Sequence, residues 1–474
     1  MRLRGMKRLI KFFLLVFVPF FVNGQISIFQ TGTNKLFLEP FSDTVTSYFS
    51  DTTQYVSVKP RLFRVSSLSD NQTSTSYLLG ASLSANISNK ITVISTYDYL
   101  AGNHNSMITE YQDSLAVFPG FDSENKRWQL NVQYKLNKFI MINFGKGKHF
   151  IGSGYRSLLL STEHSPYPYL KLTTEFGRVK YYNLYTIFMD IQNPNQDRKK
   201  HASIHFLDFQ LTHNINIGVF EGVLWQAKDE NYNRGYDVEY LNPIIFYRPV
   251  EFSKHSPDNV LIGANFNVKF DKTTLYGQIL LDDLNIARQK DGDENYSGGF
   301  FQNKFAYQLG VKSSFKLVNA FIEYNQAQPY TYAHKEPMQS YTHMNQALAH
   351  PLGANFKEVV AFADYRKDKW HFSVKLTVAR VGLDSVNTHY GQNIFASDFE
   401  AQGDGEEYSY GNFNGQGVLT QINRVQTEVA YSLKGFDIFA SVYYKKKKSD
   451  LLDQTSLWYL LGIRTFPFSV FTDY

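Results

Sequence analysis

The stretch Arg127-Trp-Gln-Leu-Asn-Val-Gln-Tyr-Lys-Leu136 alternates strictly, with polar residues at every odd position and apolar residues at every even position. A period of two is what a β-strand with one apolar and one wet face requires, because successive side chains point to opposite faces. Similar segments recur from about residue 55 to residue 474. The sequence therefore predicts an all-β protein.

The composition indicates which kind of β-protein this is. Aromatic residues make up 16% of the 474 residues, yet the mean hydropathy is only −0.33. A helical membrane protein needs runs of about twenty apolar residues, and the sequence has none after residue 24. In a transmembrane barrel, apolar side chains facing lipid alternate with polar side chains facing the lumen, which keeps the mean hydropathy low. We therefore expect a transmembrane antiparallel β-barrel.

The N-terminus has the pattern of a secretory signal. An apolar core at 12–22 and a cleavable end before Gln25 follow a basic segment that contains Arg2, Arg4, Lys7, Arg8 and Lys11. This order is typical of a signal peptide over residues 1–24. Residues 25–54 show no clear period and are expected to form a periplasmic lead-in, with the barrel over 55–474. Export to the outer membrane of a Gram-negative cell follows from this interpretation.

The connections between strands predict the topology. Tight turns are expected within eight hairpins, which pair 77–87 with 91–100, 128–136 with 139–145, 170–176 with 179–190, 203–213 with 215–226, 261–270 with 274–284, 304–315 with 317–328, 356–366 with 369–380, and 422–433 with 436–446. Each hairpin is followed by a longer polar connection, so the tight turns are expected in the periplasm and the long loops outside. A first strand at 55–65 and a last one from 456 make about eighteen.

Two other segments affect this topology. The last strand ends in Tyr474, and aromatic or apolar residues precede it at alternate positions, which resembles the signal read by barrel-insertion machinery. The stretch 236–247 also looks extended, but a spanning strand there would place later tight turns outside the cell. We therefore assign it to an extracellular or lumen-folded insertion.

Several functional classes are disfavoured. With no cysteine, the chain has no disulfide, no Cys-ligated metal and no lipoprotein anchor. A net charge of +5 is small for a nucleic-acid-binding chain of this length. His201 and His205 share one strand face about 13 Å apart, and the acidic segments 291–295 and 400–417 lack a complete calcium-loop pattern. We expect no metal, no cofactor and no catalytic residues.

The segment 145–169 is the most unusual of the long connections. It reads Gly-Lys-Gly-Lys-His-Phe-Ile-Gly-Ser-Gly-Tyr-Arg-Ser-Leu-Leu-Leu-Ser and continues to Pro-Tyr-Pro-Tyr. It lacks the Gly-Lys-Ser/Thr ending of a P-loop and the spacing of a nucleophile elbow. Its glycines allow tight backbone folding near the barrel wall.

This block resembles the signature of the Wzi capsule-assembly family and of its relatives among Bacteroidetes outer-membrane proteins, some tied to gliding motility. The matching structural positions are Gly152, Gly154, Ser161, Pro166 and Pro168, with Ser157–Leu160 between them. Two further blocks also resemble that branch: 240–244 with 258–259 and 276–278 downstream, and 350–356 with Glu358. Tyr155 and Ile151 depart from the family pattern.

The resemblance implies an eighteen-stranded barrel that associates with surface polysaccharide as a lectin-like, non-enzymatic protein. From the three blocks we expect polysaccharide contacts at Tyr155, Arg156, Glu163, His164, Asn242, His350 and Asn355. The basic run Lys445, Lys446, Lys447 and Lys448 is expected at the outer end of a strand. It could pair with lipopolysaccharide phosphates or an acidic glycan, or could be a solvated strand end that discourages edge pairing.

Two other functions stay open. An eighteen-stranded barrel can leave a water-filled channel, so a porin or outer-membrane transporter is the main alternative. The long connections suggest instead that the lumen is partly occluded. An outer-membrane hydrolase is a third class, but no serine, histidine and carboxylate show a recognisable spacing.

Overall fold

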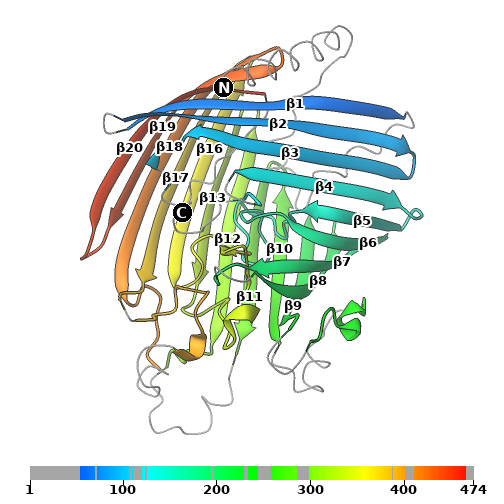
Figure 1. Ribbon diagram of the computed structural model, residues 1–474, viewed down its shortest axis with the longest axis vertical. Helices are drawn as coiled ribbons and strands as arrows, with labels where there is room; N and C mark the ends of the chain where they lie inside the picture. The colour runs from blue at the N-terminus through cyan, green and yellow to red at the C-terminus, as the bar shows by residue number, and fades with distance from the viewer. Residues whose placement is uncertain are drawn as a thin grey trace, which may run out of the picture. The chain divides into compact units, whose positions relative to one another are not determined.

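The computed structural model describes residues 54–69, 72–106, 109, 120–122, 125–193, 197–228, 233–243, 258–284, 298–386, 388–400 and 410–465. They form an eighteen-stranded antiparallel sheet that closes on itself (Figure 1). Its strands are β1 (Tyr55–Ser69), β2 (Gln72–Ser88), β3 (Ile91–Asn103), β4 (Lys126–Lys135), β5 (Ile140–Gly147), β6 (Tyr167–Phe176), β7 (Val179–Asp190), β8 (Arg198–Thr212), β9 (Ile215–Gln226), β10 (Asn259–Phe270), β11 (Thr273–Asp283), β12 (Lys304–Phe315), β13 (Val318–Ala327), β16 (Phe356–Lys367), β17 (Trp370–Leu383), β18 (Val418–Leu433), β19 (Phe436–Lys448) and β20 (Asp453–Arg464).

The predicted topology is confirmed. All eight expected hairpins are present, and their tight turns lie at one end of the barrel, which we call the tight-turn end; the opposite end is the loop end. The first strand includes Pro60, which pairs with Ala81. Residues 1–53 and 466–474 lie outside the described residues, so the signal peptide, the lead-in and the aromatic terminus stay predictions.

The barrel closes where β1 meets β20, which we call the seam. Each other strand pairs with the strand before it and the strand after it in the sheet, in chain order. Phe63–Leu68 pair with Tyr459–Arg464 in six described residue pairs, against fifteen between β1 and β2. The seam is therefore a short ladder between the first and the last strand of the barrel.

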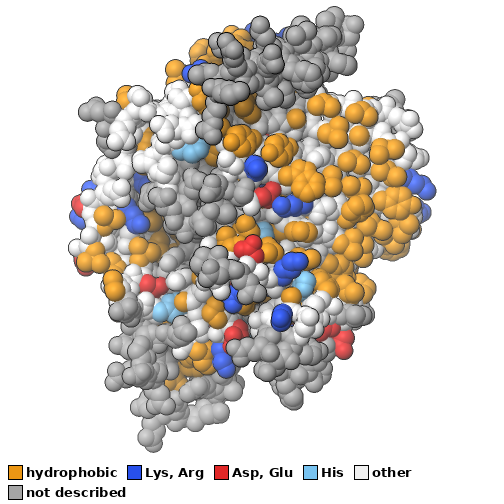
Figure 2. Space-filling view, viewed as in Figure 1, with side chains coloured by type: hydrophobic (Ala, Val, Ile, Leu, Met, Phe, Trp, Pro, Cys, Tyr) orange, Lys and Arg blue, Asp and Glu red, His pale blue; other side chains and the backbone are white. Residues whose placement is uncertain are grey.

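The two faces of the wall are as the alternation predicts. Trp128, Phe372 and Leu376 are each 44% exposed on the outer face, whereas Gln133 and Thr377 on the opposite face are 1% exposed. Figure 2 shows hydrophobic side chains gathered on the right of the molecule, over the strands labelled β2–β7 in Figure 1. An apolar outer band with a more polar interior is the pattern of a membrane-spanning barrel.

One part of the sequence prediction needs correction. The stretch 236–247 is expected to be extended within an insertion, but its described part, residues 236–243, contains a 3-10 helix, η3 (Val238–Leu241), and residues 244–247 lie outside the described residues. Tyr185 and Ser203, which point away from the lumen, donate to the carbonyl oxygens of Leu241 and Tyr240 at 2.9 and 2.8 Å. Hydroxyl groups on a membrane-facing wall need such partners, since lipid offers none. The described part of this insertion thus covers the outer face of β7–β9.

Short elements also occupy the connections between strands. These are η4 (Pro337–Gln339), η5 (Asp398–Glu400) and a small ladder of β14 (Thr342–His343) with β15 (Gln346–Ala347). Within the described residues, no helix is long and apolar enough to cross a membrane.

Candidate functional site

The glycine-rich loop (residues 148–166), which joins β5 to β6, folds into the barrel. Leu158, Leu159 and Leu160 are fully buried. They pack with the connection 328–355 and with inward-facing wall residues such as Leu184 and Phe188. Because these side chains form one apolar cluster, the two connections together make a lumen plug with its own hydrophobic core.

A buried ion-pair network holds the glycine-rich loop. The guanidinium of Arg156 pairs with Glu163 of the same loop. It also donates from Nε and Nη2 to the two carboxylate oxygens of Glu358 on β16, both at 3.3 Å. Nε2 of His350 lies 2.8 Å from Glu358 Oε2. Since Arg156 is only 1% exposed, the network ties the loop to the wall with its guanidinium buried.

A second buried carboxylate, Glu323 on β13, accepts hydrogen bonds from the backbone of the glycine-rich loop. The amides of Tyr155 and Arg156 donate to Glu323 at 2.7 and 3.0 Å. Tyr276 adds its hydroxyl at 2.8 Å. A Cβ at Gly154 would lie 2.3 Å from Glu323 Oε2 and 2.8 Å from Gln308 Oε1, so a larger residue would displace these buried side chains. The carboxylate thus acts as an acceptor that shapes the loop.

The loop reaches deep into the barrel. Gln278 on β11 donates to the carbonyl of Ile151 at 2.9 Å and accepts from the amide of Leu158 at 2.8 Å. Lys312, near the tight-turn end of β12, donates to the carbonyl of Ser153 at 2.7 Å. Because Lys312 lies four residues before the turn residue Lys316, the loop spans much of the height of the lumen.

Burial perturbs the titration of several plug residues. Desolvation lowers the pKa of His164 to about 4. The same cause lowers the pKa of Lys148 to about 7 and holds the pKa of His343 well below its usual value. The rings of His164 and His343 lie 6.3 Å apart, edge to face. The histidines are therefore neutral structural groups at pH 7.

Asn355 organises the loop end of the barrel. Its Nδ2 lies 2.9, 3.2 and 3.0 Å from the carbonyl oxygens of Gly382, Tyr390 and Gln416. Its Oδ1 accepts from the amide of Gly415 at 2.7 Å. The residue has a φ of +54°, in the left-handed region that asparagine tolerates. One amide therefore joins the connection before β16 to strand β17 and to the connection between β17 and β18.

A group of aromatic side chains lies beside Asn355, and part of this group is exposed to solvent. Phe399 is 55% exposed. Its ring lies 5.7 Å from that of Phe301, edge to face, and the Lys335 ammonium lies 5.4 Å from its centroid. Tyr410 is half-buried and packs on Phe300 at 5.4 Å. We call Phe301, Phe399, Tyr410 and Lys335 the mouth group, since they lie at the loop end.

The structure places the predicted polysaccharide contacts in different environments. Most are inside the lumen plug: Arg156, Glu163, His164, His350 and Asn355 are buried, as are Gly152, Gly154, Ser161 and Pro166. Tyr155 is half-buried, and its ring stacks 5.2 Å from that of Phe321. Asn242 and Pro168 are exposed on the outer side of the barrel. Polysaccharide binding by these residues stays a prediction.

The basic run is divided between the two sides of the wall. Lys445 is 7% exposed and shares the inward face of β19 with Tyr443. Lys447 has the same parity, whereas Lys446 and Lys448 point outward, and the Lys446 ammonium lies 3.7 Å from Asp453. All four lie at the loop end of β19, as expected.

Within the described residues, no group of three or more His, Asp or Glu side chains could hold a metal ion. Of the two acidic segments considered for calcium, residues 291–295 and residues 401–409 of the segment 400–417 lie outside the described part of the chain. Sequence reasoning missed Glu323 and Lys312, because a polar residue on the inward face of a strand looks the same whether it meets water or a loop.

Comparison with known proteins supports the fold. No family model and no curated protein matches the sequence. Among solved structures, the chain is similar to Wzi of Escherichia coli, an outer-membrane protein involved in group 1 capsule assembly and described as a carbohydrate-binding β-barrel. That likeness has a TM-score of 0.55 and 14% identity, and covers 86% of this chain and 84% of Wzi.

Two outer-membrane proteins of Pseudomonas aeruginosa are similar at lower scores. OpdK has a TM-score of 0.48 with 8% identity over 86% of this chain and 98% of its own. OprD has a TM-score of 0.47 with 9% identity over 87% and 97%. At these identities, the likeness to Wzi shows the fold alone. The chain is a closed eighteen-stranded barrel of the outer-membrane type.

Proposed function

We propose that this protein is a non-enzymatic outer-membrane barrel that binds or anchors surface polysaccharide. The observation that carries the proposal is the lumen plug, because the side chains expected to line a channel are used to hold a loop inside it. Wzi, which has a similar fold, is described as a carbohydrate-binding barrel. A role in capsule or exopolysaccharide assembly, or in gliding-associated surface organisation, follows from the resemblance of the sequence blocks.

The glycan contact is proposed at the mouth group, with the buried residues of the plug supporting it from below. Aromatic faces stack on the apolar faces of sugar rings, and Phe399 offers an exposed ring that packs on Phe301. Asn412 lies on the segment that holds Tyr410, and its Nδ2 donates to Gly299 at 2.9 Å. Lys446 and Lys448 point outward at the same end, where they could meet lipopolysaccharide phosphates.

The test measures retention of polysaccharide, purified from the surface of the source cells, on the full-length protein. Phe399→Ala and Tyr410→Ala are expected to weaken retention about fivefold each, since a stacked ring contributes roughly 1 kcal/mol. Leu451→Ala is the matched control, since this side chain is 74% exposed at the loop end but lies outside the mouth group. Equal retention by all three variants would refute the proposed contact.

The porin alternative has its own test. A plugged barrel is expected to show no steady large openings in a planar bilayer, whereas a porin conducts continuously. Steady conductance by the unmodified protein would contradict the proposal, whatever the glycan result.

A further inference from the structure

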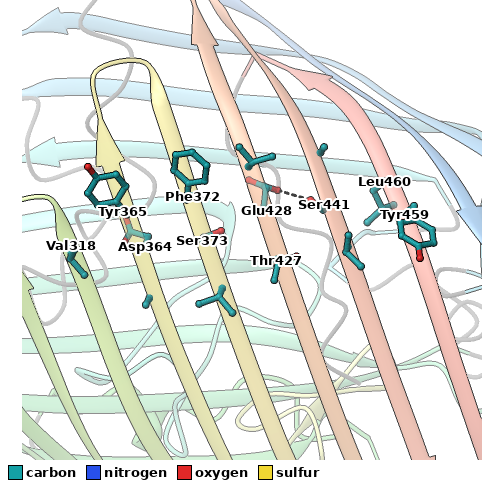
Figure 3. Close-up of a pocket in the computed structure, with 15 residues that line it drawn as sticks. Val318, Asp364, Tyr365, Phe372, Ser373, Thr427, Glu428, Ser441, Tyr459 and Leu460 are labelled. Atoms are coloured by element: carbon teal, nitrogen blue, oxygen red, sulfur yellow. Dashed lines mark hydrogen bonds between the residues drawn. The ribbon is translucent and has the colours of Figure 1, made fainter.

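An apolar groove crosses the outer wall of the barrel over β13 and β16–β20 (Figure 3). Its volume is about 570 Å³, which lies within the range of about 300–1,000 Å³ for small-ligand pockets. Figure 3 shows the rings of Tyr365, Phe372 and Tyr459 around it. Between the outward side chains, inward residues contribute mainly backbone: Glu428, for example, accepts from Ser441 at 3.2 Å on the lumen side.

The strand register creates this groove. Two rows of outward residues run across the wall, one through Tyr365, Phe372, Val429 and Ala440, and the next through Ala363, Val374, Thr427, Val442 and Tyr459. Small side chains at Ala363, Thr427 and Ala440 form the floor between larger ones. The groove therefore follows from the sizes of the residues that the pairing brings side by side.

Aromatic side chains bound the groove on its tight-turn side. Trp370 is 48% exposed, and its ring lies 4.9 Å from that of Tyr431. Phe436, on the neighbouring strand, is 37% exposed. Exposed aromatic rings at one level of a barrel wall mark the membrane–water interface. The groove begins on the loop-end side of these aromatic rings, so it faces the hydrocarbon of one leaflet.

Basic residues lie immediately beyond the aromatic level. Seven of the eight tight turns contain an exposed lysine or arginine: Lys90, Lys138, Arg178, Lys272, Lys316, Lys369 and Lys434. Three of them flank the strands that form the groove, and the Lys369 ammonium lies 5.9 Å from the centre of the Tyr431 ring. An apolar groove that is separated from a basic rim only by a level of aromatic rings complements a molecule with an acyl chain and an anionic head.

We propose that the groove binds one acyl chain of an anionic phospholipid from the periplasmic leaflet, with the lipid phosphate beside Lys369 and Lys434. The leaflet follows from the periplasmic position of tight turns in outer-membrane barrels. The site is separate from the mouth group, so it does not depend on the proposed function. It gives the tight-turn end a defined lipid contact.

The test uses the full-length protein in detergent and counts bound phosphatidylglycerol by native mass spectrometry, with phosphatidylcholine as the neutral probe. Ala440→Phe, which fills the floor, is expected to lower phosphatidylglycerol binding at least tenfold. Ala264→Phe, an outward position on β10 away from the groove, is the matched control and is expected to bind as the unmodified protein does.

Lys369→Gln and Lys434→Gln keep the test independent of folding, because both side chains are exposed on turns. Each is expected to weaken phosphatidylglycerol binding about fivefold, since a lysine near an anionic surface contributes about that factor. Lys90→Gln, on a distant turn, is the control. The proposal would be overturned if both lipids bound equally, or if the groove and lysine variants bound phosphatidylglycerol as the unmodified protein does. Displacement of phosphatidylglycerol from the groove by lipopolysaccharide would also overturn it.

Discussion

Replacing Arg156 by methionine tests how the glycine-rich loop is held in the lumen. The change keeps an unbranched apolar stem but removes the guanidinium that pairs with Glu163 and Glu358. Glu358 is 1% exposed and Arg156 is 1% exposed, so water does not replace the lost partner. Breaking a buried ion pair by removing one member costs about 3–5 kcal/mol. The fraction of molecules with the loop open should then rise by about 10² to 10³ or more.

Hydrogen exchange of the amides of residues 151–160 measures this opening directly, because exchange reports local unfolding free energies. The barrel wall should stay closed in Arg156→Met, since no strand pairing involves Arg156, and heat-modifiability on a gel checks this. Arg178→Met, on an exposed turn, is the control and should leave the exchange of these amides unchanged.

A combined variant identifies the cause. Adding Glu163→Gln and Glu358→Gln to Arg156→Met removes the uncompensated charges, so most of the lost protection should return. If Arg156→Met exchanges at the unmodified rate, the ion-pair network does not hold the loop. If the combined variant exchanges as fast as the single one, lost packing rather than bare charge is responsible.

Three further predictions follow from the lumen plug. The pKa of His164 is lowered to about 4 in the folded chain, so the unfolded chain is protonated first as the pH falls. Up to about 3 kcal/mol of stability is therefore lost between about pH 6.5 and about pH 4. The melting temperature in detergent should fall over this range, and it should fall less in His164→Gln. Gly154→Ala places a Cβ 2.3 Å from Glu323 Oε2 and should lower stability by about 1–3 kcal/mol, seen as a lower urea midpoint. Gly177→Ala meets no atom within 4 Å but has a φ of +60°, so it should show only the backbone cost of about 1 kcal/mol. Asn355→Ala leaves the amide of Gly415 without its acceptor and should expose the connection before β18 to a protease, whereas uncut protein at every protease concentration would contradict its role.

The strands and tight turns could be predicted from sequence because both depend on local patterns. A period of two fixes which face of a strand is apolar, and Asn, Asp and Gly mark the turns. The topology followed from counting these elements. Such information lies within a few residues of each element, so no knowledge of distant contacts was needed.

The lumen plug could not be predicted in the same way. Residues 148–166 have no periodicity, and Glu323 accepts from the amide of a residue 167 positions away. One signal was present in the sequence: Tyr182, Leu184 and Phe188 place apolar side chains on the inward face of β7, where a water-filled lumen would favour polar ones. Such apolar inward positions indicate that something other than water fills the barrel.

The seam between β1 and β20 has a consequence for the order of assembly. Elsewhere, pairing joins strands that follow one another along the chain, and the ladder can grow by adding the next strand. The amide of Leu62 and the side chain of Thr465 meet across 403 residues, and closing such a loop costs about 5 kcal/mol of chain entropy. Only six described residue pairs between β1 and β20 offset this entropy cost. We therefore expect the strands from β5 to β17 to form around the glycine-rich loop first, and the first and last strands to meet last.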